Sequence, residues 1–143
     1  MTAILPGLEL AGVSHTFGKK TVIQGLDLIV PGGSLTCLLG PSGCGKTTVL
    51  RLAAGLETLQ VGQIKINDVC VADVNNAIPP ETRNVGLMFQ DYALFPHLTV
   101  LRNVSFGLTS LPADSRDVMA KEALARVGML DAAGFYPHML SGG

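Results

Sequence analysis

The sequence lacks tryptophan and is poor in aromatic side chains, which make up 5% of its 143 residues. A surface that stacks on successive nucleic-acid bases needs such side chains, so their scarcity argues against one. An excess of positive charge is also missing, because 10 basic and 11 acidic residues give a net charge of -1. This balance offers no electrostatic footprint for nucleic acid or an anionic membrane surface. We therefore expect no nucleic acid among the partners.

Long apolar runs and a charged leader are absent too. No apolar run reaches the roughly 18 residues that a membrane helix needs, and residues 1–6, MTAILP, lack the basic region of a signal peptide. Three cysteines, without metal-ligand spacing, favour reduced thiols in a cytosolic protein. The length allows one domain at most. Hydrophobic residues still make up 48% of the chain, which predicts buried parallel strands.

The most informative stretch present is GPSGCGKTT at residues 40–48, which fills every fixed position of the phosphate-binding pattern G-x-x-x-x-G-K-[ST]. Its glycines permit a backbone that turns successive N–H groups toward a polyphosphate. Lys46 is placed to reach the β- and γ-phosphates, and the Thr47 hydroxyl to ligate Mg²⁺. Cys44 is either an activated thiol at a helix N-terminus or a small residue that fits the turn. The predicted nucleotide-binding residues of this loop are Gly40, Pro41, Ser42, Gly43, Cys44, Gly45, Lys46, Thr47 and Thr48.

The flanking pattern predicts a strand, a loop and a helix, which is the context that the phosphate-binding pattern requires. The apolar run 35–39 predicts a strand, and a helix is expected from Gly45 or Lys46 to residue 54, with Gly55 as its stop. Further strands are predicted over 8–17, 21–30, 63–66, 68–71 and 85–89. Helices are predicted over 99–107 and from Asp114 or Ser115 to Val127, with Gly128 as a stop and one more helical turn at 129–133.

Four separated motifs, taken together, resemble the ATP-binding subunit of ABC transporters. Phe17 stands where that family has an aromatic residue that stacks on the base; by spacing alone it would be a core or hairpin aromatic. Residues 40–48 match the phosphate loop, and Gln90 matches the glutamine loop. Residues 140–143, LSGG, match the family's signature. Taken alone, Gln90 would be a solvated strand end and 140–143 a flexible tail; the joint match favours the family.

The resemblance implies an α/β fold, a P-loop NTPase core of ABC type that is incomplete at its C-terminus. The nucleotide-binding domain would span 8–143. Within it we expect antiparallel strands over 8–34, the phosphate-loop core over 35–90, a helical subdomain over 91–139 and the signature at 140–143.

The resemblance also implies a mechanism in which two such subunits enclose two ATP molecules head to tail. Lys46 and the loop amides would hold the phosphates, and Lys46 and Gln90 would be the catalytic residues. Thr47 and Gln90 would contact Mg²⁺, and Gln90 would also sense the membrane partner. Ser141, Gly142 and Gly143 would face the ATP that is bound to the opposite subunit.

Three runs, at residues 79–86, 95–100 and 136–138, are similar to import subunits that serve ferric iron, polyamine, sulfate or sugar uptake. The partners implied are integral membrane permease subunits, a second ATP-binding subunit and, indirectly, a solute-binding protein. The implied location is peripheral, on the cytoplasmic face of the inner membrane.

The sequence departs from the family in two places. Phe17 replaces the more usual tyrosine, which preserves stacking. After its signature the family continues to an apolar strand that ends in Asp-Glu, and then to a switch histidine. This sequence contains neither, since His15, His97 and His138 all lie before or within the signature region. We therefore expect the chain to have little or no ATPase activity alone and to expose apolar surface.

Whether the natural protein ends at Gly143 is left open by the sequence. Two alternatives to an import ATPase are a non-transport ABC ATPase of DNA repair or translation, and a non-catalytic nucleotide-binding fragment. Copurification with an integral membrane subunit would separate the import ATPase from the non-transport one.

Overall fold

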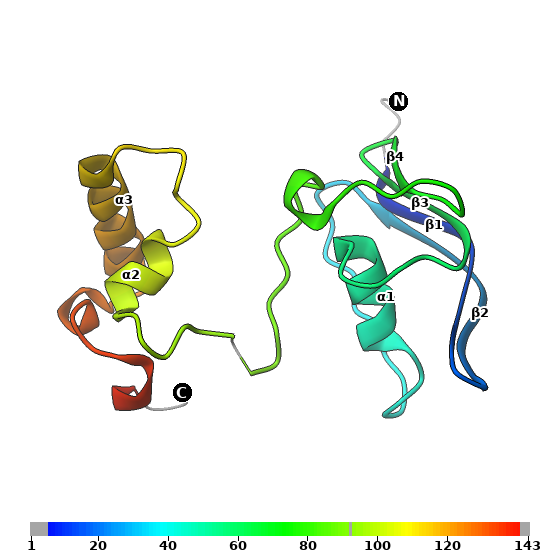
Figure 1. Cartoon of the computed structure of the whole chain (residues 1–143), viewed down its shortest axis with the longest axis horizontal. Helices are drawn as coiled ribbons and strands as arrows, with labels where there is room; N and C mark the ends of the chain where they lie inside the picture. Colours follow the sequence, from blue (N-terminus) through cyan, green and yellow to red (C-terminus); the bar gives the residue numbers. More distant parts are fainter. Residues whose placement is uncertain (1–5, 92, 141–143) are drawn as a thin grey trace. The chain divides into compact units, whose positions relative to one another are not determined.

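A computed structural model describes residues 6–91 and 93–140 (Figure 1). The chain divides into two compact units, one ending at Leu87 and the other beginning at Met88, and each is described by itself. Within the described ranges, no helix is both long enough and apolar enough to span a bilayer.

The first unit is built on a four-stranded sheet with the order β2-β1-β3-β4. Its strands are β1 (Pro6–Phe17), β2 (Lys20–Pro31), β3 (Val61–Ile66) and β4 (Val69–Ala72). All three strand pairs are antiparallel. The four strands predicted over 8–17, 21–30, 63–66 and 68–71 are therefore confirmed. Those predictions rested on the short-range alternation of apolar and polar residues and on the turn residues between the runs. Strands that are neighbours along the chain, β1 with β2 and β3 with β4, pair through short connections.

Helix α1 (Lys46–Ala54) packs against this sheet and closes the core of the first unit. Leu52 of the helix is 1% exposed, and it joins Leu10, Val13 and Ile64 of the sheet in one apolar cluster. Full burial of such side chains contributes roughly 1.5–3 kcal/mol each. The helix ends at Gly55, whose φ of 79° is the left-handed conformation that glycine adopts without strain. The predicted helix and its stop are confirmed.

Two predicted strands, at 35–39 and 85–89, do not form in the described structure. Leu35 and Leu39 are 94% and 91% exposed, and Met88 is 84% exposed. A strand persists only where its N–H and C=O groups have ladder partners, and no described strand pairs with either run. The prediction of buried parallel strands is therefore wrong for the described residues, whose sheet is wholly antiparallel. The expected exposure of apolar surface is confirmed by these three side chains.

The second unit is helical, with α2 (Val100–Ser105) and α3 (Ala113–Arg126) as its main elements. The Thr99 hydroxyl caps α2 by accepting a hydrogen bond from the Arg102 N–H. Helix α3 begins earlier than predicted, with Pro112 at the N-cap, so Asp114 lies in the first turn, where the helix dipole favours a carboxylate. Gly128, at φ 69°, follows the end of α3 as expected.

Three single turns of 3-10 helix complete the elements: η1 (Pro80–Thr82), which belongs to the first unit, and η2 (Leu130–Ala132) and η3 (Pro137–Met139), which belong to the second. The helical turn that was predicted over 129–133 is thus confirmed by η2.

Candidate functional site

The loop at residues 40–48 has the backbone that its glycines predicted. Gly43 and Gly45 have φ values of 79° and 97°, in the left-handed region, and Gly45 is the N-cap of α1. Space also requires glycine at 45, because a Cβ there would lie 2.7 Å from the Val22 carbonyl oxygen. The free N–H groups of the first turn of α1 therefore adjoin the loop, an arrangement that binds anions.

Lys46, the first residue of α1, extends its side chain back over the loop. Its ammonium donates hydrogen bonds to the carbonyl oxygens of Gly40, at 2.8 Å, and Pro41, at 2.7 Å. It also lies 3.5 Å from the Cys44 sulfur. None of the salt bridges found among the described residues involves Lys46. Its positive charge is thus held at the loop without a carboxylate, which suits a group that neutralises phosphate.

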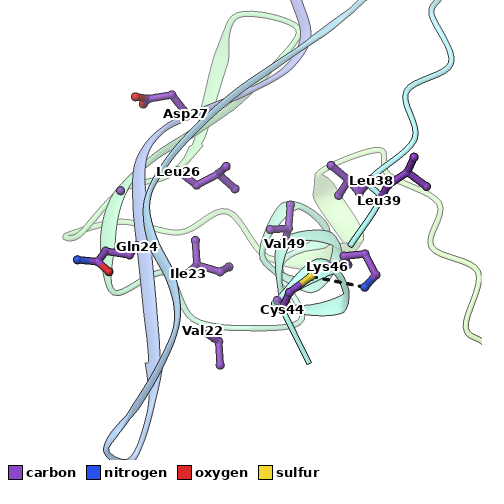
Figure 2. Close-up of a pocket in the computed structure, with 12 residues that line it drawn as sticks. Val22, Ile23, Gln24, Leu26, Asp27, Leu38, Leu39, Cys44, Lys46 and Val49 are labelled. Atoms are coloured by element: carbon purple, nitrogen blue, oxygen red, sulfur yellow. Dashed lines mark hydrogen bonds between the residues drawn. The ribbon is translucent and has the colours of Figure 1, made fainter. Parts of the chain in front are cut away.

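A cavity of about 430 Å³ lies between β2 and the start of α1, beside this loop. Figure 2 shows Ile23 and Leu26 of β2 on one side of it and Val49 of α1 on the other. Lys46 and Cys44 line it as well, and their contact is the dashed line in Figure 2. The cavity therefore combines mostly apolar walls with a few polar groups, the Lys46 ammonium and the Asp27 carboxylate among them, a combination typical of small-molecule sites.

A hydroxyl group of the loop is a suitable ligand for a magnesium ion that is bound to a polyphosphate. Thr47 is exposed at the start of α1, and hydroxyl and phosphate oxygens are ligands that Mg²⁺ accepts. Among the residues that the structure describes, no group of three or more His, Cys, Asp or Glu side chains is arranged to hold a metal by itself. The Thr47 hydroxyl would supply one ligand to a metal whose other ligands include phosphate oxygens.

Phe17 ends β1, and its side chain is 48% exposed. This exposure disfavours the reading of Phe17 as a core aromatic. The β1–β2 register connects it to the loop, because His15 pairs with Ile23 and Ile23 lies 3.1 Å from where a Cβ of Gly45 would be. The structure therefore brings the phosphate loop and the strand that carries Phe17 into one neighbourhood of the first unit.

The described structure does not test the roles predicted for the remaining site residues. Gln90 is exposed and belongs to the second unit, which is described separately. Ser141, Gly142 and Gly143 lie outside the described residues. Their assigned roles stay predictions.

Arg83 is a residue of this region that the motif analysis did not single out. Its side chain is buried, at 5% exposure, and its guanidinium donates to the carbonyl oxygens of Leu52 at 2.9 Å, Ala53 at 3.1 Å and Ile78 at 2.7 Å. Burial lowers the pKa of Arg83. The arginine thus satisfies the C-terminal carbonyls of α1, where the helix dipole favours a cation. In the sequence, only its place in the run 79–86 pointed to Arg83 as a residue of interest.

Comparisons with known proteins agree with this arrangement. A protein-family model described as ABC transporter matches residues 23–143. The spermidine/putrescine import ATP-binding protein PotA of Vibrio cholerae is 46% identical over 140 residues, which is 96% of this chain and 36% of that protein. Its counterpart in Escherichia coli K12 is 45% identical over 144 residues, covering 99% of this chain and 37% of that protein. The chain therefore spans a little over a third of the length of these curated relatives.

Solved structures show the same fold. The dimeric post-hydrolysis structure of the ATP-binding cassette MJ0796 with ADP and Pi superposes with a TM-score of 0.79 at 24% identity. The match covers 94% of this chain and 63% of that one. A second dimeric structure of MJ0796, described as a bacterial ABC transporter cassette, matches equally well. The α/β fold expected from the sequence is thus confirmed as that of ABC cassettes.

Proposed function

The chain belongs to the ABC transporter family, and from that membership we propose that it binds Mg²⁺-ATP at residues 40–48 as part of an import ATPase. The observation that carries the proposal is the loop itself. Gly45, the N-cap of α1, has a left-handed conformation. The ammonium of Lys46 lies beside it at the loop and forms no salt bridge among the described residues. Both features match what a bound triphosphate requires.

In this proposal, Lys46 and the loop amides hold the β- and γ-phosphates, and Phe17 stacks on the base. Thr47 and Gln90 contact the Mg²⁺, which supplies neutralising charge to the phosphates when it is bound. Ser141, Gly142 and Gly143 serve the ATP of a second subunit in a head-to-tail pair. This pairing is supported by the dimeric cassette structures that the chain resembles.

Hydrolysis and transport are assigned to the complete domain. This sequence has no apolar run that ends in Asp-Glu, so we propose that the chain binds ATP with little or no turnover by itself. In the complete domain, a further strand would pair with residues 35–39, where Leu35 and Leu39 are exposed here. Such a strand would supply both the missing ladder partner and the missing carboxylates.

The proposed process is solute import through permease subunits, with the ATPase on the cytoplasmic face of the membrane and a solute-binding protein upstream. The names of the two relatives support import over DNA repair or translation. Among the four solute classes expected from the sequence, those names favour polyamines.

The three cysteines provide a direct test of ATP binding, because Cys37, Cys44 and Cys70 are all exposed and free. Only Cys44 lies in the phosphate loop. We expect Mg²⁺-ATP to slow alkylation of Cys44 by a maleimide, measured by peptide mass spectrometry, and to leave Cys70 of β4 unchanged. The protection should fall sharply in Lys46→Ala, since each charge-assisted hydrogen bond that is lost weakens phosphate binding.

Two outcomes would contradict the proposal. One is alkylation of Cys44 at the same rate with and without saturating Mg²⁺-ATP. The other is equal protection of Cys44 and Cys70, which would indicate a general change of the fold rather than occupation of the loop.

A further inference from the structure

His15 of β1 is a buried polar side chain that the phosphate loop does not account for. It is 1% exposed, and neither ring nitrogen has a hydrogen-bond partner among the residues that the structure describes. Buried polar groups in folded proteins are nearly always paired, because an unpaired one keeps the full cost of its lost hydration. The retention of a histidine here, rather than an apolar residue, therefore calls for a role.

Two neighbours of the His15 ring bear on its orientation. The first is Phe17, whose ring centroid lies 4.5 Å away with an interplanar angle of 69°, an edge-to-face arrangement. The second is Glu57, whose Oε1 lies 3.9 Å from the His15 Nε2. This distance is too long for a hydrogen bond, but a movement of about 1 Å would form a charge-assisted one.

The end of β1 is also fixed to the loop that follows α1. The Thr16 N–H donates to the Gln60 side-chain oxygen at 2.8 Å, and the Gln60 amide donates back to the Thr16 carbonyl at 3.0 Å. Glu57 belongs to the same loop. The loop that follows α1 therefore holds Thr16, which stands between His15 and Phe17 in the sequence, and α1 itself begins at the phosphate loop.

We propose that His15 is a positioning residue for the nucleotide base: its ring fixes the orientation of the Phe17 ring, and Glu57 holds the His15 ring in place. The proposal rests on the proposed function, in which Phe17 stacks on the base of ATP. The Phe17 side chain is 48% exposed and would otherwise rotate with few constraints. An aromatic ring that is already oriented binds a base without first losing that freedom.

The test compares ATP with inorganic tripolyphosphate, which has the phosphates but no base. Binding of each to the full chain is measured by calorimetry in Mg²⁺ for the wild type, His15→Leu, His15→Phe and Glu57→Ala. His15→Leu removes the ring, and His15→Phe is its matched control because it keeps an aromatic edge against Phe17. Glu57→Ala changes a partly exposed side chain, so it preserves a test if His15→Leu fails to fold.

We expect His15→Leu to weaken ATP binding by roughly twofold to tenfold, the range that edge-to-face aromatic pairs contribute. Glu57→Ala should weaken it in the same direction but less, and His15→Phe, which keeps the ring edge against Phe17 but loses the contact with Glu57, should behave like Glu57→Ala rather than like His15→Leu. Tripolyphosphate affinity should be the same in all four proteins, since the base is the only group that the positioning residue serves.

A parallel loss of ATP and tripolyphosphate affinity in His15→Leu and Glu57→Ala would overturn the proposal, because a merely structural role predicts that result. Unchanged ATP affinity in both variants would overturn it as well. Failure of the wild type to bind either ligand would instead contradict the proposed function. Wild-type binding of tripolyphosphate as tightly as ATP would leave the phosphate site intact and overturn only the base-positioning role.

Discussion

At the scale of single residues, the hydrogen bonds of Arg83 lead to a prediction about the free energy of unfolding. Its guanidinium pairs with three carbonyl oxygens, two of them at the end of α1. Arg83→Met would leave those buried acceptors unpaired, so we expect the free energy of unfolding of the first unit to fall by about 2–3 kcal/mol. Urea unfolding followed by far-ultraviolet circular dichroism measures this change.

Arg51 provides the matched control for Arg83, because it lies in the last turn of the same helix but is exposed. Arg51→Met should change the free energy of unfolding by less than about 0.5 kcal/mol, as exposed substitutions commonly do. Equal losses in the two variants would show that charge near the helix end, rather than the buried hydrogen bonds, accounts for the effect.

At the scale of elements, the first turn of α2 depends on groups outside the helix. The N–H groups of Val100 and Leu101 donate to the carbonyl oxygens of Phe135 and Ala133, at 2.8 and 3.0 Å. Asn103 adds a second connection, since its side chain accepts from the Phe95 N–H at 2.8 Å and donates back to the Phe95 carbonyl at 3.1 Å. The loop that precedes α2 and the segment that precedes the signature are thus both fixed to one short helix.

This arrangement predicts that Asn103→Leu loosens the loop before α2. The Phe95 amide loses its acceptor, and we expect its hydrogen exchange, measured by NMR, to accelerate by about tenfold, the equivalent of one lost hydrogen bond. Thr99→Ala is the control, because its hydroxyl caps only the Arg102 N–H, at 3.3 Å. Exchange at Phe95 that is unaltered in Asn103→Leu, or accelerated equally in Thr99→Ala, would contradict the assignment.

At the scale of the whole molecule, the sequence predicted what local signals determine. Strand alternation located β1 and β2, and the glycine-rich motif located α1 and the conformation of Gly45. The sequence-based prediction was wrong for residues 35–39 and 85–89, because an apolar run becomes a strand only when a partner strand supplies its hydrogen bonds. It also missed Arg83 and the environment of His15, because both depend on contacts between segments distant in the sequence.

Those two unpaired runs give the last prediction. Leu35 is 94% exposed and Met88 is 84% exposed, so each presents a large apolar side chain to water. We expect the double variant Leu35→Ser, Met88→Ser to bind less of an apolar fluorescent dye, because such dyes report exposed apolar surface. Its free energy of unfolding should stay within about 0.5 kcal/mol of the wild type, since neither side chain is buried.

Leu10→Ser is the contrasting control, because Leu10 is 1% exposed in the core of the first unit. Placing a hydroxyl there should lower the free energy of unfolding of the unit by several kcal/mol, on the order of the losses measured for emptied core sites. The partly unfolded protein should then bind more of the dye. If the double variant instead lost stability as Leu10→Ser does, residues 35 and 88 would have to pack against the chain in solution. That result would contradict the exposed state of both runs and remove the reason to expect a further strand beside residues 35–39.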